Sequence, residues 1–312
     1  MRGSLLTMRA GTFLPHIGAL ASADAIKQAA QHAEALDYDC LWVAERLLYP
    51  LAPKNPYPGM PEGSQLPEHF RTSYQPIEAL TFAAALTSKI RLGTSVLNMP
   101  YHNPVMLARR LATLDALSGG RLNVGLGQAW SKDELAAMGA ATTERAARAE
   151  EFVAVLRAMW GPDPVEYHGR YFQVPASDIL PKPIQQPSPP IYMAGYVPAA
   201  LDRVARLSDG WLPSGVPLAY TTQMMDAIRQ QAVAAGRDPA ALELLVLGFV
   251  TITDAPLGEG RSDFTGSLDE LRRDVETARE LGATELILIP PVTPTVTVDD
   301  FLRAQETIRA LF

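Results

Sequence analysis

The sequence predicts an α/β protein built as a (β/α)8 TIM barrel, with insertions at the carboxyl-terminal mouth of the barrel. Apolar β-type segments alternate with helical segments along the 312 residues. These apolar segments are mostly continuous runs, as expected for parallel strands that are buried on both faces. Eight of them occur, which is the number that closes such a barrel. The predicted strands are 9–15, 40–45, 90–97, 122–127, 191–194, 210–212, 244–252 and 285–289.

Capping signals place the starts of several helices. Ser131 with Glu134, and Ser267 with Glu270, have the spacing of a capping box, in which each side chain bonds the backbone N–H of the other residue. Thr297 is expected to cap the last helix, whose apolar residues recur at helical spacing. The segments between the strands therefore predict helices that pack around a barrel.

Two long segments interrupt the alternation. Residues 46–75 and 161–190 are rich in proline and lack periodicity, and loops of this length in a compact domain are usually functional lids or disordered. In a barrel both insertions would lie over the carboxyl-terminal mouth, where active sites are built. Residues 9–312 are expected to form a single domain, preceded by an extension over residues 1–8.

Composition narrows the classes of partner. The net charge of −7 argues against nucleic acid or an anionic membrane as the main partner. No apolar run is long enough to span a bilayer, and a single cysteine, Cys40, cannot form an internal disulfide. A cytoplasmic protein is expected. The five histidines show no spacing typical of a metal site, so no metal ligands are predicted.

A glycine-rich segment at residues 117–127 is the most informative local pattern. Gly119 and Gly120 are suited to the positive φ that ends a helix. Gly125 and Gly127 are expected to expose backbone at the end of the next strand, where a flat or anionic ligand can approach. The helix capped by Ser131 follows directly, and a helix N-terminus favours anions.

Several blocks, in a fixed order along most of the chain, resemble the luciferase-like monooxygenase superfamily and particularly its coenzyme F420-dependent oxidoreductases. The resemblance implies a (β/α)8 barrel that binds FMN or the deazaflavin F420 at its mouth, and a homodimer. The blocks are the glycine segment above, ALDYDCLWVAE at 35–45, IRLGTSVL at 90–97, NPV at 103–105, LATLD at 111–115, PKP at 181–183, PPI at 189–191, AG at 194–195 and LSDGWLP at 207–213.

The resemblance assigns cofactor contacts to the end of the third strand. In similar F420 enzymes the junction that corresponds to Ser95–Val96 is a non-prolyl cis peptide, which lies against the central ring of the cofactor. Asn98 would touch the edge of that ring. A plain strand end, with Ser95 pointing into the mouth and Asn98 capping a loop, is the alternative interpretation.

The exit of the fourth strand is assigned to the ribityl chain and phosphate of the cofactor, through Gly127, Gln128 and Trp130. The alternative is that the glycine serves packing and that Trp130 covers the surface. A glutamate acid stands at the position of Trp130 in sugar-phosphate dehydrogenases of the F420 group, so their chemistry is not transferred to this chain.

The exit of the fifth strand offers a second phosphate site. The backbone amides of Gly195, Tyr196 and Val197 precede a helix that begins near Pro198, and such amides bind phosphate groups. Alternatively, Gly195 is only the glycine of a turn.

His16 and Glu45 are the predicted catalytic residues, because they follow the first and second strands at the mouth. A packing role for His16 is an equal alternative. Relatives often carry a histidine after the acidic residue, whereas this chain has Arg46, which would pair with Glu45 or hold an anionic group. His102 is expected to lie in a solvent-facing loop.

Three functional hypotheses follow. The first is an F420-dependent oxidoreductase that exchanges hydride with an organic substrate, in which the protein supplies orientation and the cofactor supplies the chemistry. The second is an FMN-dependent monooxygenase that works with a separate flavin reductase. The third is a cofactor-binding protein without turnover. The sequence does not define the substrate.

Overall fold

A computed structural model describes residues 8–312 of the chain. The predicted extension over residues 1–8 therefore lies outside the described residues, except for Met8. The side chain of Met8 is buried, with 5% of its surface exposed, and belongs to the hydrophobic core.

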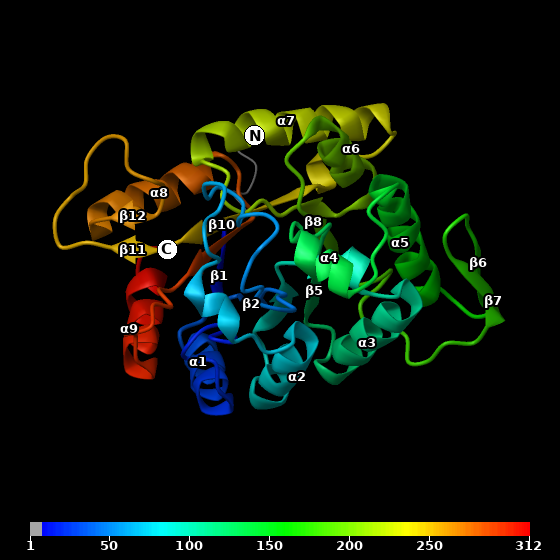
Figure 1. Ribbon diagram of the computed structural model, residues 1–312, viewed down its shortest axis with the longest axis horizontal. Coiled ribbons are helices and arrows are strands. Elements are labelled where there is room, and N and C mark those ends of the chain that lie inside the picture. The colour runs from blue at the N-terminus through cyan, green and yellow to red at the C-terminus, as the bar shows by residue number, and fades with distance from the viewer. Residues whose placement is uncertain (1–7) are drawn as a thin grey trace, which may run out of the picture.

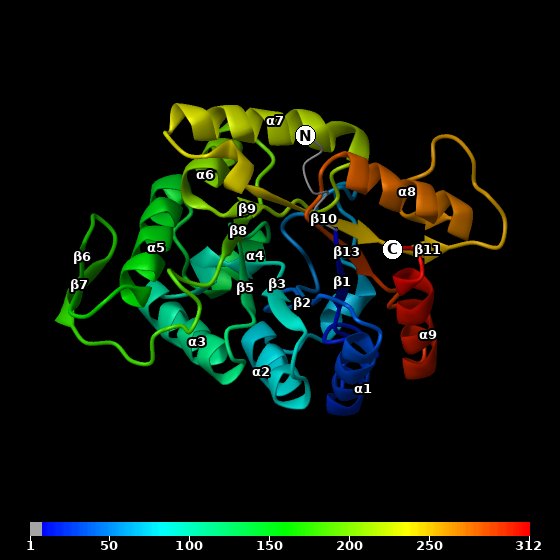
Figure 2. The same ribbon diagram turned by 180° about the vertical axis from the view of Figure 1, so that it is seen from behind.

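Within residues 8–312, eight parallel strands close into a barrel, as predicted (Figures 1 and 2). β3 pairs with β5, and β1 pairs with both β2 and β13, so the sheet has no open edge at the closure. Each predicted strand is present, with ends that differ by a few residues. The barrel strands are β1 (Arg9–Phe13), β2 (Cys40–Val43), β3 (Arg91–Thr94), β5 (Leu122–Gly127), β8 (Ile191–Met193), β9 (Gly210–Trp211), β10 (Glu243–Phe249) and β13 (Glu285–Ile289).

Helices surround the barrel, and α4 lies at the end that faces the viewer in Figure 1, which is the carboxyl-terminal end of the strands. The α-helices are α1 (Ala23–Ala35), α2 (Pro76–Leu86), α3 (Pro104–Leu117), α4 (Lys132–Ala137), α5 (Arg145–Trp160), α6 (Pro198–Leu207), α7 (Leu218–Ala234), α8 (Leu268–Glu280) and α9 (Val298–Arg309). Short 3-10 helices are η1 (Glu68–Arg71), η2 (Met99–Tyr101) and η3 (Pro239–Ala241).

The continuous apolar strands bury both faces, because one face packs on the helices and the other fills the barrel. β5 is buried along its whole length. Inside the barrel, Cys40, Trp42, Tyr192 and Leu245 belong to one apolar cluster, and Cys40 is a buried free thiol as expected. The continuous apolar runs of the sequence therefore correspond to strands that enclose a packed interior and not a pore.

The amino-terminal ends of the strands hold a polar network that we call the floor: Arg9, Trp42, Tyr192, Glu243 and Glu285. The Nε1–H of Trp42 donates to Glu285 Oε1 at 2.6 Å, and Arg9 Nε donates to Glu285 Oε2 at 3.2 Å. Arg9 also donates to Glu243 at 2.5 Å, and the Tyr192 hydroxyl donates to the same carboxylate at 3.0 Å. Burial raises the pKa of Glu285, while Arg9 and Trp42 oppose this rise. Each member of the floor therefore has a partner.

The third strand is interrupted where the sequence predicted a special junction. β3 ends at Thr94, and β4 (Leu97–Asn98) resumes the pairing with β5. The peptide bond between Ser95 and Val96 is cis, as the resemblance implied.

The two long insertions are largely irregular. Residues 46–75 contain only the short helix η1, and residues 161–190 contain an antiparallel hairpin of β6 (Val165–His168) and β7 (Gln173–Ser177). The second insertion leads from the end of α5 to the start of β8. Residues 184 and 185 donate to Asp115, and Gln185 also donates to the carbonyl oxygen of Leu122 at the start of β5, so this part lies at the amino-terminal ends of the strands and not over the mouth as predicted. The hairpin packs against α5. Its turn is held by Glu151 of α5, whose carboxylate accepts from the backbone N–H groups of residues 170–172.

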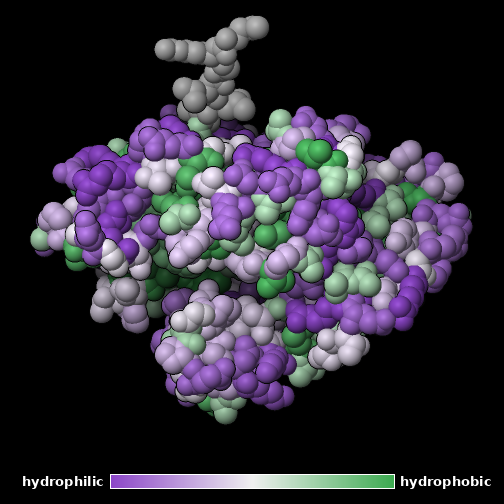
Figure 3. Space-filling model, turned by 90° about the horizontal axis from the view of Figure 1, so that it is seen from above, coloured by the Kyte–Doolittle hydropathy of each residue, from purple (hydrophilic) through white to green (hydrophobic). Residues whose placement is uncertain are grey.

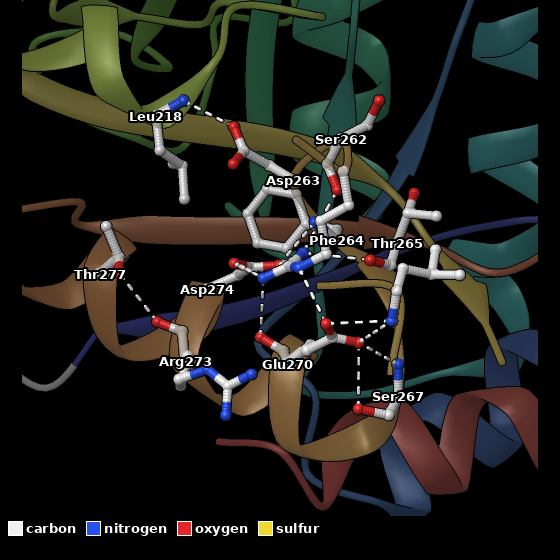
Figure 4. Close-up of polar contacts among 12 residues, drawn as sticks. Leu218, Ser262, Asp263, Phe264, Thr265, Ser267, Glu270, Arg273, Asp274 and Thr277 are labelled. Carbon is white, nitrogen blue, oxygen red and sulfur yellow. Dashed lines mark hydrogen bonds and ion pairs between the residues drawn. The ribbon is translucent and has the colours of Figure 1, made fainter. Parts of the chain in front are cut away.

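A third excursion lies after the seventh barrel strand, between β11 (Thr251–Ile252) and β12 (Thr265–Gly266). It is fixed to α8 by two carboxylates (Figure 4). Glu270 accepts from the backbone of Ser267 at 2.8 Å and of Gly258 at 2.8 Å, and Asp274 accepts from Arg261 at 2.6 Å. The capping box predicted for Ser267 and Glu270 is present.

Candidate functional site

The carboxyl-terminal ends of β2, β4 and β5 bring together most of the predicted site residues. Glu45 follows β2, Asn98 ends β4, and Gln128 follows β5. Because neighbouring parallel strands end at the same edge of a barrel, side chains that directly follow them meet there. Seen from above, the surface has a recess on its left side in which hydrophobic residues gather (Figure 3).

Glu45 connects two of these elements. One carboxylate oxygen accepts from the backbone N–H of Asn98 at 2.7 Å, and the other accepts from Nε2 of His102 at 2.8 Å. The side chain of Glu45 is only 4% exposed, and that of His102 is 15% exposed. Asn98 Oδ1 in turn accepts from the N–H of Ala129 at 3.0 Å. The solvent-facing position expected for His102 is therefore wrong, since its ring is largely buried against Glu45.

His16 follows β1 as predicted, but its ring is used by the backbone. Nδ1 lies 2.9 Å from the carbonyl oxygen of Leu14, and Nε2 lies 2.9 Å from both the carbonyl oxygen and the amide nitrogen of Ala44. Burial lowers the pKa of the imidazole. A ring whose two nitrogens are both bonded within the protein joins β1 to β2. The geometry therefore favours the packing alternative for His16 over proton transfer.

Arg46 does not pair with Glu45. Its guanidinium lies 3.0 Å from Glu134 Oε1 of α4, between the rings of Phe70 and Trp130, at 4.8 and 4.6 Å from their centroids. Tyr57 packs on both rings. Trp130 thus joins the 46–75 insertion to the exit of β5.

The capping box expected at α4 forms only in part. Ser131 Oγ accepts from the N–H of Glu134 as predicted. The Glu134 carboxylate instead accepts from the backbone N–H groups of residues 47 and 48 at 2.8 and 3.1 Å, and from the Tyr101 hydroxyl at 2.8 Å. Its position beside Arg46 explains the difference, because the ion pair draws the carboxylate away from the helix N-terminus.

A cavity of about 160 Å³, which we call the anion cavity, opens beside the exit of β5. Three buried nitrogen atoms of its lining side chains make no hydrogen bond within residues 8–312: Arg145 Nε, Arg148 Nε and Gln128 Nε2. Such donors are rare in folded proteins, and their meeting at one cavity suits a bound anion. The cavity is lined by Met99, Pro100, His102, Gln128, Ala141, Arg145, Arg148, Ala149, Phe152 and Phe172.

Arg145 and Arg148 are held in place by other contacts. Arg145 donates to the carbonyl oxygens of Gln128 and, at 2.8 Å, of Ala129. The guanidinium of Arg148 lies over the ring of Tyr171, 4.3 Å from its centroid. Two fixed cations and an amide donor therefore meet at one cavity, and this set of groups suits a phosphate or another oxyanion.

The glycines at the exit of β5 have a packing reason. A Cβ on Gly125 would collide with the carbonyl oxygen of Thr94, and a Cβ on Gly127 would collide with the side chain of Val96. The space beside these glycines is thus filled by the neighbouring strand and not left open, contrary to the expectation from the sequence. Contact of Gly127 with a cofactor stays a prediction. Gly119 and Gly120 have the predicted positive φ values of 71° and 81°.

The exit of β8 presents free backbone amides. Within the described part of the chain, the N–H groups of Gly195, Tyr196 and Val197 donate no hydrogen bond. Gly195 is also required by packing, because a Cβ there would lie 2.9 Å from Cβ of Ala200. Val197 caps α6 with extended backbone and no side-chain hydrogen bond. These features are compatible with the predicted phosphate contact, which stays a prediction.

No helix within residues 8–312 is long and apolar enough to cross a membrane. No group of three His, Cys, Asp or Glu side chains in the same range could hold a metal ion.

Comparison with known proteins defines the class. The family model for luciferase-like monooxygenases matches residues 2–257. The chain is 33% identical over 183 residues to an FMNH2-dependent dimethylsulfone monooxygenase of Pseudomonas putida, a match that covers 57% of this chain and 49% of that one. It is 30% identical over 213 residues to an F420-dependent glucose-6-phosphate dehydrogenase of Amycolatopsis mediterranei, covering 66% and 58%.

A solved structure has the same fold. The crystal structure of monooxygenase RslO1 from Streptomyces bottropensis superposes with a TM-score of 0.78 and 23% identity, over 97% of this chain and 98% of that one. The protein belongs to the luciferase-like monooxygenase family. Members of this family are oxidoreductases, and the relatives above use either F420 or FMN.

Three residues of the site were missed from the sequence. Arg145 and Arg148 lie three residues apart at the start of α5, so both reach the same side of the helix. That spacing, directly after the glycine-rich strand and its short helix, is the signal that could have revealed them. For His102 the sequence offers no comparable signal, because its partner Glu45 lies 57 residues away.

Proposed function

We propose that this protein is an F420-dependent oxidoreductase that transfers hydride between the deazaflavin and an organic substrate at the carboxyl-terminal mouth of the barrel. Family membership supports the reaction class, and the anion cavity is the observation that carries the placement of the cofactor. When bound, the cofactor supplies the hydride chemistry, and the protein supplies binding and orientation.

The residues of the mouth fit such a group. Arg145, Arg148 and Gln128 have donors without acceptors and would hold the cofactor phosphate. Ser95, Val96 and the adjoining Asn98 would lie against the ring, as the resemblance implies. The amides of residues 195–197 would add phosphate contacts from the exit of β8, the strand that pairs with β5.

The surface beside the cavity also suits the acidic tail of F420. Arg148 and Arg170 both contact the ring of Tyr171, at 4.3 and 5.1 Å from its centroid. The side chain of Arg170 is 70% exposed, so these arginines continue from the cavity to the surface. Arg170 is paired with Glu144 at 2.7 Å, so a carboxylate of the tail would replace that partner.

An FMN-dependent two-component monooxygenase is the second candidate. The relative from Pseudomonas putida favours it, because it is an FMNH2-dependent monooxygenase. In that case a separate reductase would supply reduced flavin. A binding protein without turnover is the third hypothesis, since Arg46 replaces the histidine of many relatives.

Titration of the purified protein with F420 and with FMN, followed by cofactor fluorescence, tests the choice. We expect micromolar binding of F420. Micromolar binding of FMN with none of F420 would instead select the monooxygenase. Oxidation of reduced F420 by a panel of enones, quinones and imines separates an enzyme from a binding protein, because a binding protein would oxidise none of them.

A homodimer is part of the same proposal, on the ground of the family resemblance. Light scattering on a size-exclusion column should give twice the mass of the chain. A monomeric mass over micromolar concentrations would contradict it.

A further inference from the structure

His102 lines the anion cavity but plays no part in the site predicted from the sequence. Its Nε2–H donates to Glu45 at 2.8 Å. Nδ1 makes no hydrogen bond within the described range 8–312. The ring therefore has one nitrogen fixed by a carboxylate and one that is free for a group in the cavity.

The charges around this ring are arranged on two sides. Glu45, at the end of β2, lies behind it, and its side chain is 4% exposed. Arg145 and Arg148 of α5 line the same cavity as the ring. Glu45 favours the imidazolium form, whereas the two arginines disfavour it as long as no anion is bound. An anion in the cavity would remove that repulsion and stabilise the charged ring.

We propose that His102, held by Glu45, is an anion-binding residue of the cavity that contacts the oxyanion of the ligand in its protonated form. This inference rests on the proposed function, which places the cofactor phosphate in the cavity. It adds a donor whose charge depends on pH to the permanent cations of Arg145 and Arg148. Glu45 is then a positioning residue that acts through His102, and not a proton donor to the substrate.

The sign of the pH effect follows from linkage. The ligand binds the protonated ring more tightly, so affinity is highest below the pKa of His102 and falls as the pH rises through it. For the same reason, bound anion must raise the pKa of His102. A purely structural imidazole would show neither effect.

Sulfate is the probe of choice, because it stays dianionic from pH 6 to pH 8.5 and only the protein titrates. Calorimetry on the full chain should give a sulfate Kd that weakens about tenfold over this range, the loss expected for one charge-assisted hydrogen bond. In His102→Gln the amide can still donate to Glu45, and the pH dependence should disappear. The same Kd and pH profile in this variant and in the wild type would overturn the proposal.

His168 provides a matched control. It pairs with Glu166 at the same 2.8 Å distance, but the pair lies on the exposed hairpin and not at the cavity. His168→Gln should leave the sulfate Kd and its pH profile unchanged. A loss of pH dependence in this control would contradict the assignment to His102.

Nuclear magnetic resonance of the imidazole C–H groups gives a readout that is independent of activity. Sulfate should raise the pKa of His102 in the wild type, and Glu45→Gln should lower it. An unchanged His102 pKa on adding sulfate overturns the proposal. If neither sulfate nor a cofactor binds the wild type, the placement of the phosphate fails as well. If a cofactor binds and His102→Gln binds it equally at every pH, only the present inference fails.

Discussion

The two ends of the barrel use the same kinds of polar side chain to opposite effect. At the floor, Arg9, Trp42 and Glu285 lie in a network in which each donor has an acceptor. At the mouth, Arg145 and Arg148 each have a buried donor that finds no acceptor within the described chain. A satisfied buried network specifies one arrangement of the strands, whereas buried donors without acceptors reduce stability until a ligand binds. The comparison therefore separates residues that serve folding from residues that serve binding.

The floor should give the largest loss of stability. Glu285→Ala removes a fully buried carboxylate, which leaves the Trp42 N–H without an acceptor and Arg9 with only Glu243. We expect the free energy of unfolding to fall by about 3–5 kcal/mol. Urea denaturation followed by circular dichroism measures this. Glu306→Ala on α9 is the control, because that carboxylate is 55% exposed and its pairing with His32 should contribute under about 1 kcal/mol. A loss below about 1 kcal/mol would show that the floor is not a stabilising network.

The ion pair of Arg46 with Glu134 at the mouth should behave like a weaker floor. Arg46→Met removes the cation between Phe70 and Trp130 and leaves Glu134 with neutral donors. The expected loss is about 2 kcal/mol, because the buried carboxylate of Glu134 loses its cation but keeps its neutral donors. Arg71→Met is the matched control in the same insertion, because its ion pair with Glu68 is exposed and should contribute under about 1 kcal/mol. Equal losses in thermal unfolding of the two variants would contradict the distinction.

Substitutions in the anion cavity should weaken cofactor binding without lowering the free energy of unfolding. Arg148→Met removes a buried donor that has no acceptor, so we expect the cofactor Kd to rise about tenfold while the free energy of unfolding does not fall. Arg157→Met, further along α5 and paired with Asp209, is the control for loss of an arginine from this helix. An unfolding free energy that falls with no change in Kd would place Arg148 with the structural residues.

The same contrast explains what could be predicted from the sequence. The barrel strands follow from continuous apolar runs, and the Ser267 cap follows from local spacing, because both depend on neighbours along the chain. His16 could not be resolved, since its role depends on Leu14 and Ala44 being within hydrogen-bond distance of both ring nitrogens. The partner of Arg46 could not be predicted either. Glu134 lies on a helix 88 positions further along the chain and comes close to Arg46 only in the closed barrel.

The candidate site was predicted in outline rather than in detail. The strand exits were correctly located, because a barrel brings them to one face. The spacing of Arg145 and Arg148 indicates that they share one side of α5, but it does not show that this side packs beside the exit of β5. Gly125 and Gly127 were correctly placed at the end of a strand, but the expectation that their backbone is open to a ligand was wrong. The sequence does not show that Thr94 and Val96 lie against them.

Glu270, like the carboxylates of the floor, accepts several hydrogen bonds, but it holds only a loop. Its substitution should therefore give the smallest change in stability. Hydrogen bonds from the backbone of Ser267, Gly258 and Leu257 lower its pKa to about 2. Because the folded-state pKa lies below the ordinary value of about 4.5, this carboxylate stabilises the protein above that pH, and the contribution is lost as the pH falls toward 2. Glu270→Gln should therefore melt at a lower temperature than the wild type at pH 7. The gap should narrow steadily in melting curves recorded between pH 5 and pH 2.5, with Glu276→Gln on the same helix as the control. A gap that is constant with pH would mean that the loop is held by shape and not by the charge of Glu270.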